Sequence, residues 1–370
     1  MSDERRTSPV ELLWDLVFVF AVTQVSELVA DALSWEGVGQ GALVLALIWW
    51  AWSAFVWAAN ATDPNRTSFR AALVVALVSI FITGLAIPHA FEDDATLFAA
   101  SYALVRFIHL GLYVQASREG NAAWSAIVGF AAATTAGMAL LVAGSLVEGV
   151  PRTILWLLAI ALDYAGPAWL TRERLAGLQA VAVAHFAERY GLFIIICLGE
   201  SIVAIGLGAS GHELDFGLIA AIALSLLIVV GLWWTYFDRA AEDAEAHLRQ
   251  NDNPVLAAAD AYSYIHLLLV AGIVFFAVGS KWAIAGIDKQ LDPVASLALF
   301  GGVALYLLGH AAFRLRMIGR ADMLEVTAAA VIGVEWLVLR HSDAWVGLVW
   351  IALVLAALTF QETREVASSA

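Results

Sequence analysis

AALVVALVSIFITGLAI, residues 71–87, is an unbroken run without a charged side chain, and its apolar and polar positions do not alternate. Strands of a membrane barrel would alternate, so this run predicts a helix that crosses a bilayer. Comparable runs recur along the 370-residue chain, which is 62% hydrophobic and only 14% charged. Soluble domains carry about 25% charged residues. The sequence therefore predicts an all-α fold, a polytopic transmembrane helical bundle.

The apolar runs predict about twelve spans joined by short polar loops. These spans cover residues 10–31, 38–61, 69–90, 95–116, 122–146, 152–170, 186–209, 214–237, 255–280, 294–315, 323–340 and 343–361. Short motifs recur in the same order in both halves of the chain, among them IWWAWSAFVW at 48–57 and GLWWTYFD at 231–238. This order favours two parallel six-helix repeats, although apolar sequences rich in Trp also match by chance.

The repeat would divide the chain into four parts. These are a first membrane half at residues 1–170, a cytoplasmic connector at 171–188, a second membrane half at 189–361 and a cytoplasmic tail at 362–370. Basic residues predict the orientation, because cytoplasmic loops are enriched in Lys and Arg. Of the 19 Lys and Arg residues, fourteen fall in segments on the side of the N-terminus, four fall on the opposite side, and only Arg106 cannot be assigned to a loop. Both termini are therefore predicted to be cytoplasmic.

Charged side chains inside the spans are the candidate functional residues, since each costs at least a few kcal/mol at bilayer depth unless it is paired or hydrated. Arg106 and His109 lie three residues apart in VRFIHLGL and therefore share one helix face. Arg106 cannot lose its proton and needs a counter-ion. The candidates are Asp15, Glu27, Asp163 and Glu200. A purely structural ion pair is an equally open interpretation.

Helix 10–31 carries a polar stripe at helical spacing, formed by Glu11, Asp15, Gln24 and Glu27. Glu11 and Asp15 are four residues apart, and two carboxylates this close in a dry site favour one of them as a proton carrier. Glu11 also fits a structural role at the helix N-terminus, and Gln24 fits interhelical hydrogen bonding.

Glu200 and Ser201 lie in CLGES, where small residues allow close helix packing and a local opening of the helix. Glu200 is the first carboxylate that we expect to act in a proton or ion pathway. The surrounding GESIVAIG is not a G-x-S-x-G motif, and the sequence has no H-E-x-x-H pair and no P-loop. No catalytic residue, metal ligand or cofactor is predicted, and an enzyme is the less favoured interpretation.

Three segments of the chain resemble the bacterial low-temperature-requirement A family of integral membrane proteins. They are ELLWDLVFVFAVTQVSELV at 11–29, WWAWSAFVWAANATDPNR at 49–66 and ERYGLFIIICLGESIVAIG at 188–206. The resemblance covers most of the chain and is weakest after about residue 290. It implies a multi-pass bacterial inner-membrane protein linked by name to growth in the cold, as a stress response. By motif position it singles out Glu11, Asp15, Glu188, Glu200 and Ser201.

We expect a proton- or ion-coupled secondary transporter with a buried Arg/carboxylate site. It would lie in the lipid bilayer and bind a small anionic solute or an ion. No nucleic acid is expected as a partner, and a homo-oligomer is possible. The alternatives are an intramembrane enzyme or binder of a lipid-like substrate, and a channel or structural stress protein. The expected substrate or proton pathway comprises Glu200, Arg106, Asp15, Ser201, His109, Gln24, Glu27, Asp163, Glu11 and Glu188.

Overall fold

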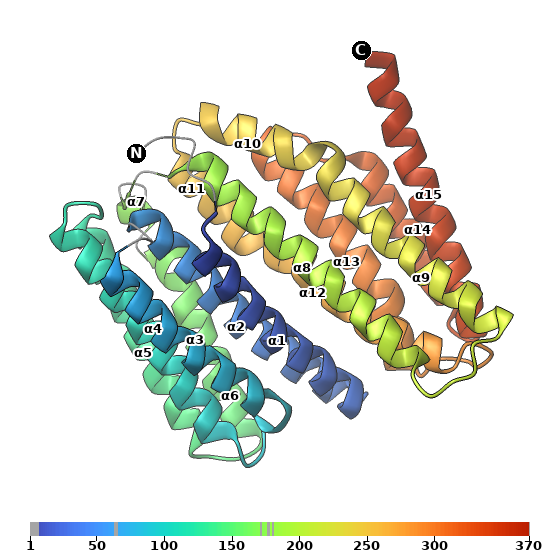
Figure 1. The fold of residues 1–370 in the computed structure, drawn as a ribbon, viewed down its shortest axis with the longest axis horizontal. Coiled ribbons are helices and arrows are strands. Elements are labelled where there is room, and N and C mark those ends of the chain that lie inside the picture. The colour runs from blue at the N-terminus through green and yellow to red at the C-terminus, as the bar shows by residue number, and fades with distance from the viewer. Residues whose placement is uncertain (1–6, 63–65, 171, 176–177, 180, 370) are drawn as a thin grey trace. The chain divides into compact units, whose positions relative to one another are not determined.

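The computed structural model describes residues 7–62, 66–170, 172–175, 178–179 and 181–369 (Figure 1). The predicted charge distribution includes four residues that lie outside the described part of the chain. They are Arg5, Arg6 and, for their side chains only, Arg174 and Arg239. Regular structure within the described ranges is helical, apart from one bridge between Gln290 and Asp343. The predicted all-α helical bundle is confirmed.

The helices follow the predicted spans closely. In chain order they are α1 (Pro9–Ala32), α2 (Trp35–Ala61), α3 (Thr67–Ala86), α4 (Ala95–Arg118), α5 (Trp124–Ser145), α6 (Val150–Ala165), α7 (Arg172–Leu175), α8 (Val183–Ala209), α9 (Phe216–Thr235), α10 (Ala241–Gln250), α11 (Pro254–Ala258), α12 (His266–Ala285), α13 (Pro293–Ile318), α14 (Met323–Leu339) and α15 (Ala344–Ser369). One π-helical turn, Gly166–Leu170, extends α6, and two others, Tyr236–Ala240 and Ala259–Ile265, join α9 to α10 and α11 to α12.

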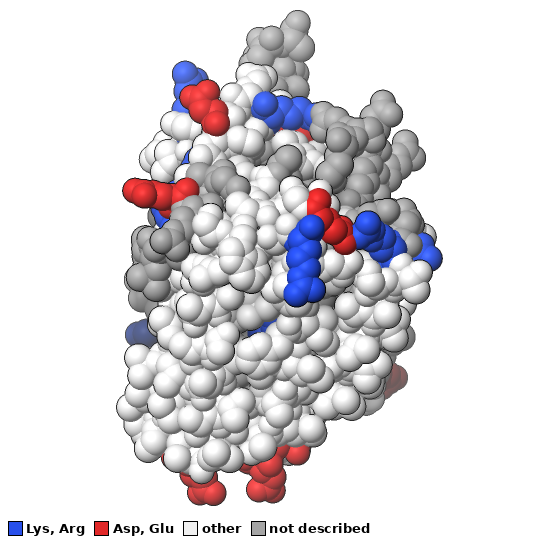
Figure 2. Space-filling model, turned by 90° about the vertical axis from the view of Figure 1, so that its left-hand side faces the viewer, with Lys and Arg blue, Asp and Glu red and all other residues white. Residues whose placement is uncertain are grey.

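Within the described part of the chain, ten helical segments are long and apolar enough to cross a membrane by length and composition. Two further helices at predicted spans, α6 and α14, are shorter, with 16 and 17 residues. Helices suit this setting because they satisfy every backbone hydrogen bond within one segment. Figure 2 shows one face of the molecule, on which charged side chains gather toward the two ends and leave a wide, largely uncharged band between them. The chain is therefore a multi-pass membrane protein.

The chain folds into two compact units, which are described separately. The first unit comprises Met1–Leu28, Gly39–Tyr190 and Leu248–Ser263. Within it, α3, α4, α5 and α6 form a series in which each helix packs against the next along the chain. In the most apolar stretch of α2, 83% of the residues are buried, compared with 44% in that of α3. Buried Trp side chains of α2 use their indole N–H groups, since Trp49 Nε1 donates to the carbonyl of Ser263 and Trp57 Nε1 to its hydroxyl.

The second unit comprises Val29–Val38, Gly191–His247 and Tyr264–Ala370. In it α12 packs closely on α13, α13 on α14, and α15 on both α14 and α9. Glycines bring the backbones of α12 and α13 together: a Cβ at Gly279 would lie 2.3 Å from the Leu299 nitrogen, and one at Gly302 would lie 2.4 Å from the Phe276 nitrogen. Small residues are the usual means of close helix contact in membranes. The predicted pair of six-helix repeats stays a prediction.

Candidate functional site

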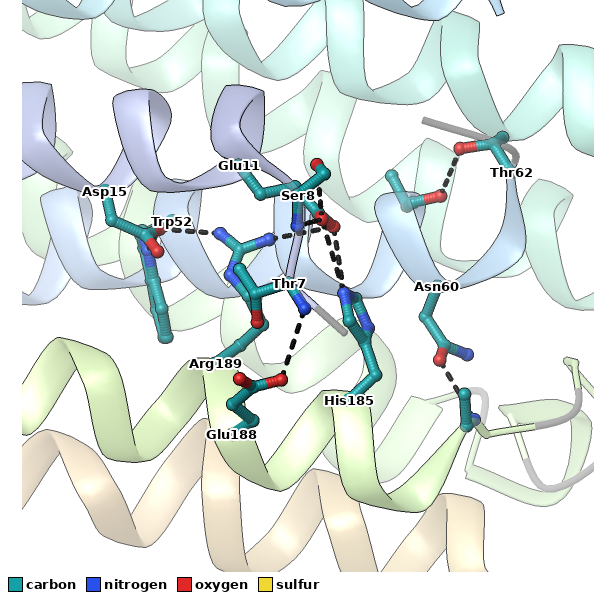
Figure 3. Close-up of polar contacts among 12 residues, drawn as sticks. Thr7, Ser8, Glu11, Asp15, Trp52, Asn60, Thr62, His185, Glu188 and Arg189 are labelled. Atoms are coloured by element: carbon teal, nitrogen blue, oxygen red, sulfur yellow. Dashed lines mark hydrogen bonds and ion pairs between the residues drawn. The ribbon is translucent and has the colours of Figure 1, made fainter. Parts of the chain in front are cut away.

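Two carboxylates of α1 meet a buried arginine of α8 in the first unit (Figure 3). Arg189 Nη2 donates to Asp15 Oδ1 at 2.6 Å, and Arg189 Nη1 lies 3.2 Å from Glu11 Oε1. None of these three side chains is more than 2% exposed. Buried ions need close partners of this kind, because their desolvation is otherwise too costly.

His185 completes this group, which we call the Arg189 cluster (Glu11, Asp15, His185 and Arg189). The Nε2 of His185 lies 3.1 Å from Glu11 Oε1, and its side chain is 1% exposed. His185 and Arg189 are four residues apart on α8, as Glu11 and Asp15 are on α1. A four-residue step keeps both members of a pair on one helix face, so the two pairs meet face to face.

Neutral side chains hold the carboxylates of this cluster in place. Trp52 Nε1 donates to Asp15 Oδ1 at 2.8 Å, and the backbone N–H and hydroxyl of Ser8 donate to Glu11 Oε2 at 2.8 and 2.7 Å. Hydrogen bonds to charged groups are the stronger class, worth about 1.5–3 kcal/mol each. These donors hold the carboxyl groups of Asp15 and Glu11 beside Arg189.

The charges of the Arg189 cluster leave room for one proton. Two carboxyl groups face one guanidinium, which cannot be deprotonated. With both carboxyl groups ionised, their charge exceeds that of Arg189 by one, and one proton cancels the difference. A water-poor site favours neutrality, because uncompensated charge is costly there.

A second buried ion pair joins α4 to α6. Arg106 Nη2 donates to Asp163 Oδ1 at 2.9 Å, and the Thr134 hydroxyl on α5 donates to the same oxygen at 2.6 Å. Arg106 is 2% and Asp163 1% exposed. Asp163, one of the four counter-ions that the sequence offered, is therefore in contact with Arg106. We call Arg106, Thr134 and Asp163 the Arg106 cluster.

The Arg106 cluster keeps unused hydrogen-bonding capacity in its interior. Arg106 Nε and Nη1 and Asp163 Oδ2 are buried and have no hydrogen-bond partner among the residues that the structure describes. One turn along α4, the same holds for His109 Nδ1, whose ring packs on Tyr113 with centroids 5.2 Å apart. Unmade hydrogen bonds of buried charged groups are costly.

The other predicted site residues lie outside these two clusters. Gln24 and Glu27 are half-buried on α1. Glu188 is exposed, and its Oε2 accepts a hydrogen bond from the Thr7 backbone at 3.2 Å. Glu200 and Ser201 are buried in the middle of α8, within the second unit, and their part in a pathway stays a prediction.

Comparison with known proteins agrees with the motifs of α1, α2 and α8. The family model of the bacterial low temperature requirement A protein matches residues 6–360. The chain belongs to this family. An uncharacterised protein of Rhizobium meliloti (strain 1021) is 29% identical to the chain over 314 residues, which are 83% of this chain and 77% of that protein. No solved structure matches it. The family resemblance expected from the sequence is confirmed, and it extends beyond residue 290.

Sequence reasoning missed three polar residues of the two clusters, namely His185, Arg189 and Thr134. Arg189 is buried in α8, although it had been assigned to the cytoplasmic side with the loop residues, and Arg152 is 4% exposed. Arg106 is thus not the only buried basic residue, and the expectation that it alone lies outside the loops is wrong. The matching four-residue spacings of His185 and Arg189 and of Glu11 and Asp15 were the available signal.

Proposed function

We propose that this low temperature requirement A protein is a proton-coupled secondary transporter of a small anionic solute. The observation that carries the proposal is the Arg189 cluster, where two buried carboxylates and a histidine surround one permanent cation. Its single excess negative charge makes one proton the natural ligand. The bacterial inner membrane, with both termini in the cytoplasm, is the location that the distribution of basic residues supports.

The Arg106 cluster supplies the reason for an anionic solute. Arg106 and Asp163 together are neutral, and the guanidinium still has donors at Nε and Nη1 without a protein acceptor in the described ranges. An anion bound to these donors brings one uncompensated negative charge into the membrane. A proton carried with it cancels that charge, which is a physical reason to couple the two movements.

Proteoliposomes that contain a pH-sensitive dye test the proposal. Addition of inorganic phosphate or of a dicarboxylate such as succinate should acidify the interior when the wild-type protein is present and leave empty liposomes unchanged. Asp15→Asn and Arg106→Gln should each abolish the response, because one removes a proton carrier and the other the anion donors. Glu92→Gln is the matched control, since Glu92 is 72% exposed. Full activity in both site variants would exclude the proposal.

Glu200 is tested in the same assay. Its side chain is 5% exposed in the middle of α8, and we propose that it also exchanges a proton during transport. Glu200→Gln keeps the shape of the side chain and removes its ability to exchange a proton. The variant should fold and lose coupled uptake. Unchanged uptake would remove Glu200 from the mechanism.

A further inference from the structure

Three carboxylates of the second unit converge where α13 ends and α14 begins. They come from Asp322, which caps α14, from Glu325 in its first turn, and from Glu362 on α15. Each side chain offers one oxygen, and these oxygens all lie within 4.8 Å of one another. Because α14 packs against α15, this helix contact brings the three ligands together.

Burial distinguishes this group from an ordinary acidic surface. Glu325 is completely buried, and its Oε2 has no hydrogen-bond partner in the described part of the chain. Glu362 Oε1 also has no hydrogen-bond partner among the described residues. A carboxylate oxygen without a donor in such a place loses its hydration and gains nothing in return. These oxygens are therefore available to a positively charged ligand.

Two neighbouring side chains hold the carboxylates without neutralising them. His310 is completely buried on α13, and its Nδ1 lies 2.8 Å from Glu325 Oε1. Arg314, one turn further along α13, places Nη1 3.0 Å from Asp322 Oδ2 and 3.6 Å from Glu325 Oε1. Three carboxyl groups therefore face one guanidinium, so the cluster offers more carboxylate oxygens than Arg314 can pair with.

We propose that Asp322, Glu325 and Glu362 bind a hard divalent cation of the magnesium and manganese class. Oxygen-only ligands select these ions over softer transition metals, which prefer sulfur and imidazole nitrogen. His310 is a positioning residue that orients Glu325, as hydrogen-bonded partners commonly do around metal ligands. Arg314 competes with the cation for the oxygens of Asp322 and Glu325. The proposal does not rest on the proposed transport activity, since its three ligands belong neither to the Arg189 cluster nor to the Arg106 cluster.

Manganese binding to the full-length protein in lipid nanodiscs tests this site, because free Mn²⁺ is measured directly by electron paramagnetic resonance. One saturable site per chain is expected, with Mg²⁺ as a competitor, and Mn²⁺ should raise the melting temperature. Glu325→Gln and Glu362→Gln should each weaken binding at least tenfold. Glu335→Gln is the matched control, since Glu335 lies ten residues further along α14, about 15 Å away.

Arg314→Gln is expected to change the affinity for Mn²⁺ in the opposite direction. It removes the positive charge beside Asp322 and should tighten Mn²⁺ binding. Size-exclusion chromatography checks the fold of each variant, and if Glu325→Gln does not fold, Glu362→Gln decides, because Glu362 is only half-buried. The proposal is overturned if no Mn²⁺ binds to the wild-type protein, if all variants bind equally, or if Arg314→Gln does not tighten binding.

Discussion

Removal of Arg106 alone is expected to destabilise the protein strongly. Arg106→Met would leave the carboxylate of Asp163, 1% exposed, with the Thr134 hydroxyl as its remaining donor among the described residues. Breaking a buried ion pair from one side costs about 3–5 kcal/mol, because the other charge stays buried without compensation. Asp163→Leu should cost a similar amount, since it leaves the Arg106 guanidinium buried instead.

The double variant Arg106→Met with Asp163→Leu removes both charges and should recover most of this loss. Replacement of a buried pair by apolar side chains is often neutral or stabilising by about 1–4 kcal/mol. Reversible unfolding by dodecyl sulfate in mixed micelles, followed by Trp fluorescence, measures each free energy of unfolding. The cycle should give a coupling of at least about 3 kcal/mol between the two positions. Additive losses would refute the assignment of this pair.

An exposed pair is the matched control for that cycle. Arg66 and Glu119 form an ion pair whose side chains are 48% and 25% exposed. Exposed pairs contribute about 0.2–1 kcal/mol, so the cycle Arg66→Gln with Glu119→Gln should show a coupling below about 1 kcal/mol. The Arg106 and Asp163 double variant also separates function from packing. If it transports as the wild type does, the pair only holds the helices together and the anion site must lie elsewhere.

The remaining predictions use the same unfolding assay. Gly279→Ala should destabilise the protein by about 1–3 kcal/mol, because its Cβ would lie 2.3 Å from backbone of α13. Gly333→Ala is the control, because nothing lies within 4 Å of a Cβ built on this helical glycine, and it should be neutral or stabilising by up to about 1 kcal/mol. Equal losses of stability at both positions would contradict the close contact of α12 with α13. Trp52→Phe should lower stability by at least about 1.5–3 kcal/mol, because it removes the indole donor to Asp15; an unchanged midpoint would show that this hydrogen bond contributes nothing.

The membrane class and the helix positions were predictable because the bilayer allows few solutions. A run such as 71–87 must satisfy its own backbone, and a helix does so without any partner segment. Helix α3 indeed covers Thr67–Ala86. The buried charge at Arg106 was predictable for the same reason, since it interrupts an apolar run at mid-span.

The contacts between helices were not predictable from local patterns. Four acids were possible counter-ions for Arg106, and only the packing of α4, α5 and α6 selects Asp163. Thr134 carries no sequence signal at all, because threonines are common on apolar helices. Arg189 resembled a loop residue near the start of a span, and its role became visible only when α8 was found beside α1.

The position of Arg106 also affects how the protein is made. Its helix, α4, has a mean hydropathy of 1.5, the lowest of the ten spans, and an arginine at mid-helix raises the free energy of translocon-mediated insertion by about 2.5–3.5 kcal/mol. Thr134 follows 28 residues later and Asp163 57 residues later. At about 5–20 residues per second, the nascent chain waits roughly 3–11 s for its counter-ion. During that interval α4 is the segment most exposed to mis-insertion and to proteases of membrane quality control.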